Sequence, residues 1–293
     1  MTQKLLCIVG PTGTGKTSLA VDLSKQLPSV LISADSSQVY RGMDIVTGKD
    51  HPQDVILHGI DLVSPSDPLS VSLWYQKVKD LLTKSPLPII VGGTGLYVKA
   101  ITEGIPTMSI PPNPSLRAEL EPLSVLDLQL HLAGLNSKKF SEMNNSDKHN
   151  KRRLVRAIEI ASAITPNFPK NISHDTLIIG LKFNNQDRYL SNLKSRVKAR
   201  VEGGAIEETK LLLSKYNADL LSHRAIGYRS IIAYLGGSLT RSAMLTSWLA
   251  DEYAYSKRQM TWFSKIKNVK WYECEDPHLF EKLAELVTSW YHK

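Results

Sequence analysis

The stretch GPTGTGKT, residues 10–17, constrains this chain more than any other feature. It follows the apolar run LLCIV and precedes SLAVDLSKQL, in which apolar residues recur with helical spacing. The pattern G-x-x-x-x-G-K-T between a strand and a helix is typical of a phosphate-binding loop, whose backbone N–H groups converge on an anion. The residues expected to bind phosphate are Gly10, Pro11, Thr12, Gly13, Thr14, Gly15, Lys16 and Thr17.

The last two residues of this loop define its chemistry. Lys16 offers a mobile positive charge to phosphate oxygens, and the hydroxyl of Thr17 is a typical ligand for Mg²⁺ that bridges two phosphate groups. We therefore expect Mg²⁺ as the cofactor, with Thr17 as its protein ligand. Taken alone, the motif predicts a nucleotide-binding protein that uses ATP.

The first hundred residues alternate strand-like and helix-like runs, which predicts an α/β fold with a P-loop NTPase-like parallel sheet flanked by helices. Strands are expected within 4–10, 29–36 and, less regularly, 55–63. A helix is expected over 69–84, and residues 86–101 read as a strand, a glycine-rich turn and a helix. Polar or glycine-rich segments follow these strands, at the sheet edge where such folds bind ligands.

A change in composition and in the alternation of strands and helices predicts a second domain. Residues 106–114 are rich in proline, and the following polar helical sequence lasts until a strand-like run at 176–183. We expect an α/β catalytic core of residues 1–109 and 176–293, with C-terminal helices, and a helical insertion domain of residues 110–175. A strand is expected at 268–275 and a closing helix at 278–291.

The charge balance favours a polyanionic partner. Lys and Arg number 36 against 28 Asp and Glu, which gives a formal net charge of +8. Basic residues gather at 149–156, 188–200, 223–229 and 256–263. Each cluster alone also fits a solvated helix face, but four of them beside a phosphate site favour nucleic acid. No segment resembles a membrane span or a secretory signal, so a cytoplasmic protein is expected, by default a monomer.

One residue typical of nucleotide hydrolases is missing from the expected position in this sequence. The strand PIIVGGTG ends in glycines and a threonine, where a motor-type ATPase usually has an acidic residue that orients Mg²⁺ and water. The acidic residue with a comparable position is Asp35, at the end of VLISAD. This observation disfavours ATP hydrolysis.

Six stretches, in order along nearly the whole chain, closely resemble the tRNA dimethylallyltransferases of the bacterial type. They are GPTGTGKT, SADSSQVYRGMDIVTGK, VGGTGLY, DKHNKRRLVRAIEI, AIGYRSIIAYL and KRQMTWF. The resemblance implies transfer of a dimethylallyl group from dimethylallyl diphosphate to N6 of adenosine 37, in tRNAs reading codons that begin with U, with release of diphosphate. The substrates it implies are that diphosphate and the anticodon stem-loop of tRNA.

The same resemblance implies roles for the catalytic residues. Lys16 and its loop would hold the departing diphosphate, Asp35 would be the general base, and Thr94 would contact a phosphate or the amine. Asp35 could instead be a second-shell Mg²⁺ ligand or a helix N-cap, and Thr94 a helix cap. Arg196 matches an arginine that contacts the diphosphate, although RVKAR offers Arg200 as a rival.

Contacts to tRNA also follow from the family pattern. The expected residues are Asp35, Ser36, Ser37, Gln38, Arg152, Arg153, Arg156, Arg224, Gly227, Tyr228 and Arg229. Trp262 could stack on a base, but a core position fits it better. Glu252 and Tyr253 stand where members of the family often have Thr-Arg, so one basic contact is missing.

Three alternatives remain open at this point. A prenyltransferase acting on free adenine nucleotides would need no large basic surface. A P-loop kinase of a small metabolite would consume ATP, whereas prenyl transfer would release intact diphosphate. A non-enzymatic RNA-binding protein would use the loop only as an anion site.

Overall fold

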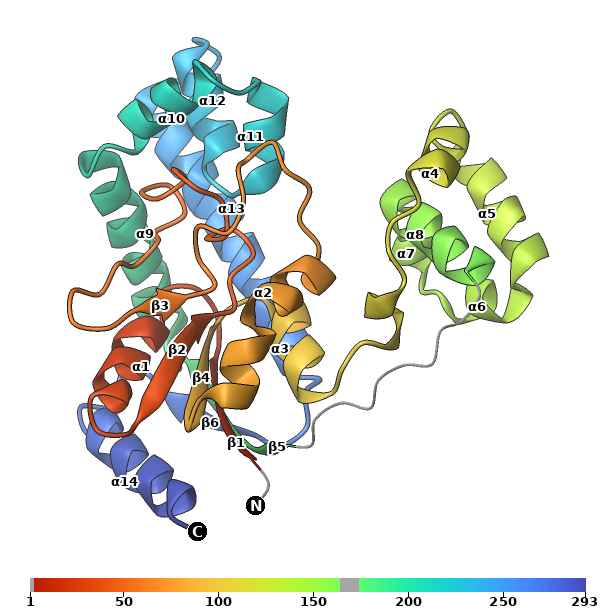
Figure 1. The fold of residues 1–293 in the computed structure, drawn as a ribbon. Helices are drawn as coiled ribbons and strands as arrows, with labels where there is room; N and C mark the ends of the chain where they lie inside the picture. Colours follow the sequence, from red (N-terminus) through yellow and green to blue (C-terminus); the bar gives the residue numbers. More distant parts are fainter. Residues whose placement is uncertain (1–2, 164–173) are drawn as a thin grey trace. The chain divides into compact units, whose positions relative to one another are not determined.

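A computed structural model describes residues 3–163 and 174–293 of the protein (Figure 1). Its backbone divides into two compact units, one comprising Met1–Gly104 with Ile172–Lys293 and the other Ile105–Asn171. These boundaries lie four or five residues before the expected limits of 109/110 and 175/176, an offset of ordinary size for boundaries read from a sequence.

The larger unit is built on a six-stranded sheet with the order β3-β2-β4-β1-β5-β6, in which every neighbouring pair is parallel. This confirms the predicted parallel α/β core. Its strands are β1 (Gln3–Val9), β2 (Ser29–Ser33), β3 (Leu57–His58), β4 (Leu87–Gly92), β5 (His174–Lys182) and β6 (Val269–Glu273). The strand expected within 55–63 is only two residues long, because Gly59 and Asp61 both adopt positive φ and end it.

Helices cover both faces of this sheet. Successive side chains of strand β1 point to opposite faces, and each set packs against helices. Leu6 and Ile8 pack into one core with α1 and α14, whereas Leu5, Cys7 and Val9 pack into the other with α2, α3, α9 and α13. The helices of this unit are α1 (Lys16–Ser24), α2 (Val71–Lys84), α3 (Gly95–Thr102), α9 (Gln186–Glu202), α10 (Ala205–Leu213), α11 (Ala218–Arg224), α12 (Tyr228–Leu235), α13 (Arg241–Phe263) and α14 (Leu279–Tyr291). Among the described helices, none combines the length and hydropathy of a membrane span.

The smaller unit is helical in its described part. It contains a 3₁₀ turn (Pro106–Ser109) and the helices α4 (Pro114–Leu120), α5 (Val125–Leu135), α6 (Ser137–Glu142), α7 (Asn145–Lys148) and α8 (Lys151–Ser162). Leu128, Leu132 and Leu154 form the centre of its own core. The buried carboxylate of Glu159 joins α8 to α4, because it accepts a bidentate pair of hydrogen bonds from Arg117 at 2.7 and 3.0 Å.

Candidate active site

The glycines of the phosphate-binding loop permit a backbone that other residues would strain. Gly15 adopts φ 79° at the N-cap of α1, a left-handed conformation. At Gly10 a Cβ atom would lie 2.3 Å from the carbonyl oxygen of Leu181 in β5, so only glycine fits between the two strands. The loop therefore connects β1 to α1 in the way that the sequence motif predicts.

Lys16 folds back across this loop. Its Nζ donates to the carbonyl oxygen of Pro11 at 2.5 Å and lies 3.5 Å from Oγ1 of Thr14. Burial lowers the pKa of Lys16 from its usual 10.5 to about 8, an effect that the negative charges of Asp35 and Asp50 partly offset. An ammonium desolvated in this way gains strongly from an incoming anion.

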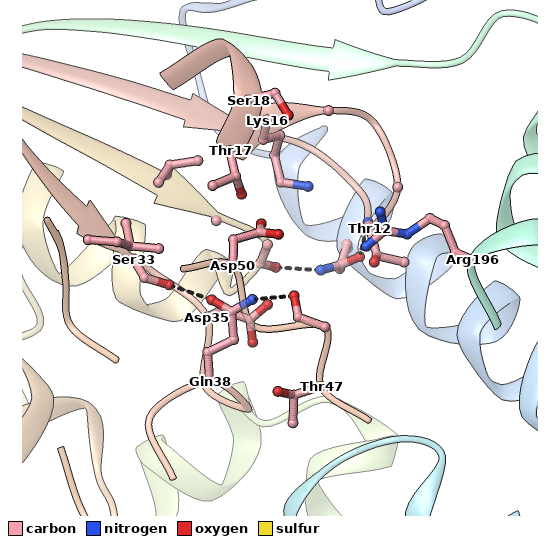
Figure 2. A pocket seen from close by; sticks show the side chains of 18 of the residues that line it. Thr12, Lys16, Thr17, Ser18, Ser33, Asp35, Gln38, Thr47, Asp50 and Arg196 are labelled. Atoms are coloured by element: carbon pink, nitrogen blue, oxygen red, sulfur yellow. Dashed lines mark hydrogen bonds between the residues drawn. The ribbon is translucent and has the colours of Figure 1, made fainter. Parts of the chain in front are cut away.

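A pocket opens beside the loop, and Figure 2 shows the side chains that point into it. We call it the P-loop pocket. Its lining residues are Thr12, Gly13, Gly15, Lys16, Thr17, Ser18, Ser33, Asp35, Gln38, Thr47, Gly48, Asp50, Leu57, Val91, Gly92, Gly93, Arg196, Arg200 and Gln259. The structure thus brings together Lys16, Thr17, Asp35, Gln38 and Arg196, which the sequence singled out from three separate segments. Pro11 and Thr14 are buried within the loop instead.

Asp35 follows β2 at the carboxyl edge of the sheet. One carboxylate oxygen, Oδ1, accepts hydrogen bonds from the amide of Ser37 at 2.9 Å and from its hydroxyl at 2.6 Å. The other oxygen has no hydrogen-bond donor among the described residues. No helix begins within 34–56, so the helix N-cap alternative for Asp35 is wrong. The carboxylate is held in place by one oxygen and can accept a proton at the other.

Thr94 is tied to the segment that carries Asp35. Its Oγ1 accepts a hydrogen bond from the amide of Ser36 at 2.9 Å and lies 3.3 Å from the hydroxyl of Ser36. Although Thr94 precedes α3, its side chain makes no capping hydrogen bond to that helix. The helix-cap alternative is therefore wrong for this hydroxyl, which fixes the loop after β2 against the turn after β4.

A second pocket adjoins the first, and we call it the neighbouring pocket. It is lined by Thr12, Asp35, Ser36, Ser37, Val46, Thr47, Arg200, Arg224, Ala225, Ile226, Glu252 and Tyr255. The two pockets share four residues, Thr12, Asp35, Thr47 and Arg200. Asp35 thus lines both the P-loop pocket and the neighbouring pocket.

The two candidate arginines of α9 differ in their partners. Burial lowers the pKa of Arg196, and no carboxylate in the described ranges forms an ion pair with its guanidinium. Arg200 forms an ion pair of 2.7 Å with Glu252, and both side chains are nearly buried, at 11% and 7% exposed. Because Arg196 is uncompensated, it is the stronger candidate for binding an anion in the P-loop pocket.

Three residues of this site escaped the sequence reasoning. The amide of Gln259 bridges two loops, since its Oε1 accepts from the N–H of Thr12 at 2.9 Å and its Nε2 donates to the carbonyl of Gly93 at 3.1 Å. Tyr189 donates to the carbonyl of Thr12 at 3.0 Å. Tyr255 lines the neighbouring pocket, and burial raises its pKa. Gln259 lies in the KRQ stretch, which pointed to the region without indicating this contact.

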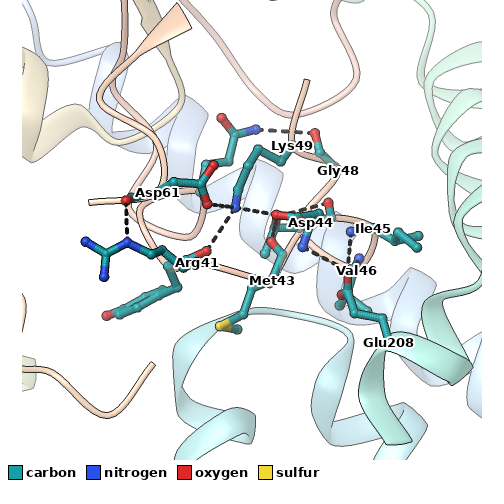
Figure 3. A network of polar contacts seen from close by, with 12 residues as sticks. Arg41, Met43, Asp44, Ile45, Val46, Gly48, Lys49, Asp61 and Glu208 are labelled. Carbon is teal, nitrogen blue, oxygen red and sulfur yellow. Dashed lines mark hydrogen bonds and ion pairs between the residues drawn. The ribbon is translucent and has the colours of Figure 1, made fainter. Parts of the chain in front are cut away.

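The long loop between β2 and β3 is held from two sides (Figure 3). The fully buried ammonium of Lys49 contacts Asp44 at 2.5 Å, Asp61 at 2.6 Å and the carbonyl of Tyr40 at 2.9 Å. Asp44, Asp61 and His51 have the spacing of a metal site, but Lys49 already supplies the cation between the two carboxylates. This cluster is therefore an ion-pair network that shapes the loop.

Glu208 of α10 holds the same loop from the other side. Its carboxylate accepts hydrogen bonds from the amides of Asp44 at 2.8 Å, Ile45 at 2.6 Å and Val46 at 3.1 Å. Thr47, Gly48 and Asp50, which come directly afterwards, line the P-loop pocket. Lys49 and Glu208 thus fix one wall of that pocket.

The expected tRNA contacts in the larger unit fall into two groups. Arg224 lines the neighbouring pocket and lies over the ring of Tyr40, and the exposed Arg229 donates from Nη2 to both carboxylate oxygens of Asp251. Tyr228 is completely buried, so its side chain cannot contact RNA, and Gly227 is buried with φ 104° against Trp248. The expectation for Gly227 and Tyr228 is corrected, because packing explains both.

The three arginines expected to contact tRNA from the smaller unit also differ. Arg152 is exposed and forms no ion pair with any residue that the structure describes. Arg153 forms an ion pair with Asp147, and Arg156 pairs with Glu159 while donating to the carbonyls of Thr107 and Ile110. Arg156 thus ties α8 to the segment around the 3₁₀ turn, whereas the guanidinium of Arg152 has no ion-pair partner among the described residues.

Helix α13 carries Trp262, Glu252 and Tyr253, for which expectations also followed from the sequence. Trp262 is 41% exposed and packs over Gly95, where a Cβ atom would lie 1.8 Å from the indole, so the core position expected for it is wrong. Glu252 and Tyr253, the departures from the family pattern, have partners. Glu252 pairs with Arg200, and the hydroxyl of Tyr253 accepts from Gln186 at 2.7 Å.

This fold and pocket define a P-loop-like α/β protein in which the glycine-rich loop lies next to a carboxylate. The family model for IPP transferase matches residues 38–266, and that for isopentenyl transferase matches residues 3–61. The chain therefore belongs to the IPP transferase family.

Relatives match nearly the full length. The tRNA dimethylallyltransferase of Finegoldia magna is 34% identical, covering 98% of this chain and 96% of the relative. The crystal structure of the tRNA isopentenylpyrophosphate transferase from Bacillus halodurans superposes with a TM-score of 0.73 at 32% identity, covering 99% and 97% of the two chains. A eukaryotic dimethylallyltransferase acting on tRNA shares the fold, with a TM-score of 0.80 at 21% identity.

Proposed function

We propose that the protein transfers a dimethylallyl group from dimethylallyl diphosphate to N6 of adenosine 37 in tRNAs that read codons beginning with U. One observation carries this proposal: Asp35 lines both the P-loop pocket and the neighbouring pocket. A carboxylate between an anion-binding site and a second opening is what a transfer from a diphosphate donor to a separate amine requires. A cytoplasmic monomer is the accompanying proposal for its location and state.

The donor would bind with its diphosphate in the P-loop pocket. Its carbon–oxygen bond breaks with the electron pair leaving on the diphosphate, so negative charge grows where Lys16, Arg196 and the loop amides are aimed. Preorganised charge of this kind stabilises a transition state more than a ground state. Lys16 gains most, because burial destabilises its charge in the free protein.

The acceptor amine would approach from the neighbouring pocket. N6 of adenosine is a weak nucleophile because its lone pair is shared with the purine ring. As N6 bonds to the carbon of the dimethylallyl group, its proton passes to the unpartnered oxygen of Asp35. Ser37 holds the other oxygen, and Thr94 fixes this segment through Ser36.

The pocket suits a hard divalent cation. The hydroxyl of Thr17 lines it, an oxygen ligand of the kind that Mg²⁺ prefers, and the carboxylates of Asp35 and Asp50 add negative charge to the same pocket that favours a cation. Bound there, Mg²⁺ would supply positive charge to the diphosphate oxygens.

The tRNA would be held mainly by its backbone. An adenosine stacked in an anticodon loop must leave the stack to reach Asp35, which costs a few kcal/mol. Arg152 has no ion-pair partner in the described ranges and would contact a phosphate directly, whereas Arg229 would exchange Asp251 for one. Ser36, Ser37 and Arg224 line the opening that the base would enter. Gln38 lines the P-loop pocket, where Ser33 and Gly48 hold its amide.

The decisive experiment is mass spectrometry of adenosine 37 after incubation of an anticodon stem-loop with the protein, dimethylallyl diphosphate and Mg²⁺. We expect the mass of one dimethylallyl group on that adenosine, one diphosphate released per transfer and no ATP consumed. Preferential labelling of AMP would instead identify a nucleotide prenyltransferase. ATP turnover with a small metabolite would identify a kinase, and RNA binding without either reaction would identify a binding protein.

A further inference from the structure

The Arg200–Glu252 ion pair lies where the two pockets meet. Arg200 lines both pockets, whereas Glu252 lines only the neighbouring one. The guanidinium of Arg200 contacts Oε1 of Glu252 at 2.7 Å and donates to the carbonyl of Val46 at 3.3 Å. It also lies against Gly48, where a Cβ atom would come within 2.5 Å of its Nη2. Arg200 is thus held on three sides.

Glu252 is itself anchored for this contact. Its Oε1 accepts a second hydrogen bond from the indole N–H of Trp248 at 3.2 Å, and Trp248 is completely buried. The carboxylate therefore cannot turn away without breaking two hydrogen bonds in a nearly dry environment. In such surroundings the attraction between the two charges is screened much less than at a surface.

The Arg200–Glu252 pair lowers the net positive charge that the P-loop pocket presents to an anion. Three cationic side chains line the P-loop pocket, namely Lys16, Arg196 and Arg200. Lys16 and Arg196 have no ion-pair partner in the described ranges, whereas Glu252 neutralises Arg200. The net positive charge facing a diphosphate is consequently smaller than the count of lining cations suggests.

We propose that Glu252 is a positioning residue that holds Arg200 away from the diphosphate and thereby limits the affinity of the site for the diphosphate product. This inference rests on the proposed function, in which diphosphate leaves from the P-loop pocket. Both donor and product carry the diphosphate, so a third free guanidinium would strengthen the binding of both. Binding that is uniform along the reaction does not raise kcat, and it slows release of the product.

The test is calorimetric titration with inorganic diphosphate at fixed Mg²⁺, combined with product-inhibition constants in the prenyl transfer assay. For Glu252→Gln we expect diphosphate to bind more tightly by on the order of tenfold, because Arg200 loses its carboxylate partner and its charge becomes available to the diphosphate. For the double variant Glu252→Gln with Arg200→Met, which removes both charges of the pair, we expect an affinity within about twofold of the unchanged protein. The matched control is Glu202→Gln, which breaks an exposed ion pair with Lys198 on the same helix as Arg200 and should leave the affinity for diphosphate unchanged.

The possible outcomes separate the two levels of inference. Weaker diphosphate binding by the double variant would show that Arg200 already contacts the diphosphate, and would overturn the proposal. Unchanged binding by a folded Glu252→Gln variant would overturn it as well. If Glu252→Gln does not fold, the double variant still decides. If the unchanged protein does not bind diphosphate, or binds it independently of Lys16, the proposed function fails instead.

Discussion

The phenol of Tyr228 donates a hydrogen bond of 2.7 Å to the carboxylate of Glu208, the same carboxylate that holds three backbone amides of the loop after β2. A residue that the family pattern suggested for RNA contact thus supports one wall of the P-loop pocket from within the core. The link runs from α12 through α10 to the loop that carries Thr47 and Gly48.

We expect Tyr228→Phe to lower the free energy of unfolding by about 1.5–3 kcal/mol, because the buried phenol loses its hydrogen bond to a charged group, Glu208. Denaturant unfolding measures this change. The affinity for tRNA should stay within about twofold, since the ring is buried. Tyr253→Phe, which removes an exposed hydrogen bond to Gln186, should cost less than about 1 kcal/mol. A large loss of tRNA affinity in a stable Tyr228→Phe variant would contradict the structural role.

Asp35→Asn should lower kcat by about 10²–10⁴, because the proton of the amine loses its acceptor. Binding of inorganic diphosphate, measured by calorimetry, should be equal or tighter, since a negative charge is removed from the pocket. The matched control is Asp50→Asn, which changes a carboxylate that lines only the P-loop pocket. Equal losses of kcat in the two variants would mean that Asp35 acts through charge alone and is not the base.

The affinity for diphosphate should depend on pH through Lys16. Its pKa of about 8 in the free protein lies below the usual 10.5, so the ammonium is present below pH 8 and is lost as the pH rises through that value. Only the ammonium attracts the anion, and affinity should therefore fall above about pH 8. Titrations of the unchanged protein and of Lys16→Gln separate this effect from ionisation of the ligand. A constant ratio of their affinities between about pH 7 and 9 would refute the assignment.

Thr94→Val should reduce kcat by about tenfold with little change in the KM for the donor, because the hydrogen bond to the Ser36 amide that fixes the Asp35 segment is lost. Steady-state kinetics measure both constants. Thr94→Ser keeps the hydroxyl and should restore most of the rate. A Thr94→Ser variant as slow as Thr94→Val would show that the methyl group matters rather than the hydrogen bond.

Lys49→Met should lower the free energy of unfolding by about 1.5–3 kcal/mol, because the half-exposed Asp44 and Asp61 would lose the hydrogen bonds of the buried ammonium between them. Lys84→Met breaks a surface pair with Asp80, in which both side chains are largely exposed, and should cost less than about 1 kcal/mol. Urea denaturation compares the two. Similar values for both variants would mean that the buried network adds no more stability than a surface pair.

Much of the site could be predicted from local sequence. The phosphate-binding loop depends on glycines at particular positions, and the chemistry of Lys16 and Asp35 follows from their place at the ends of two strands of one sheet. The boundaries of β3 could not be predicted, because the apolar run continues past Gly59 and Asp61, where the backbone turns. The contact of Gln259 with Thr12 joins segments 247 residues apart and has no local signal.

The sequence by itself determined the alternation of strands and helices, the phosphate-binding loop and the family, because periodicity, glycine conformation and motif order are properties of neighbouring residues. Only the tertiary structure decided which polar side chains are free. It buried Tyr228 against Glu208, paired Arg200 with Glu252 and left Arg196 without an ion-pair partner in the part of the chain that the structure describes. The physical reason is that burial and ion pairing depend on which distant segments meet, and in a low-dielectric site that meeting determines whether a charge can bind a ligand.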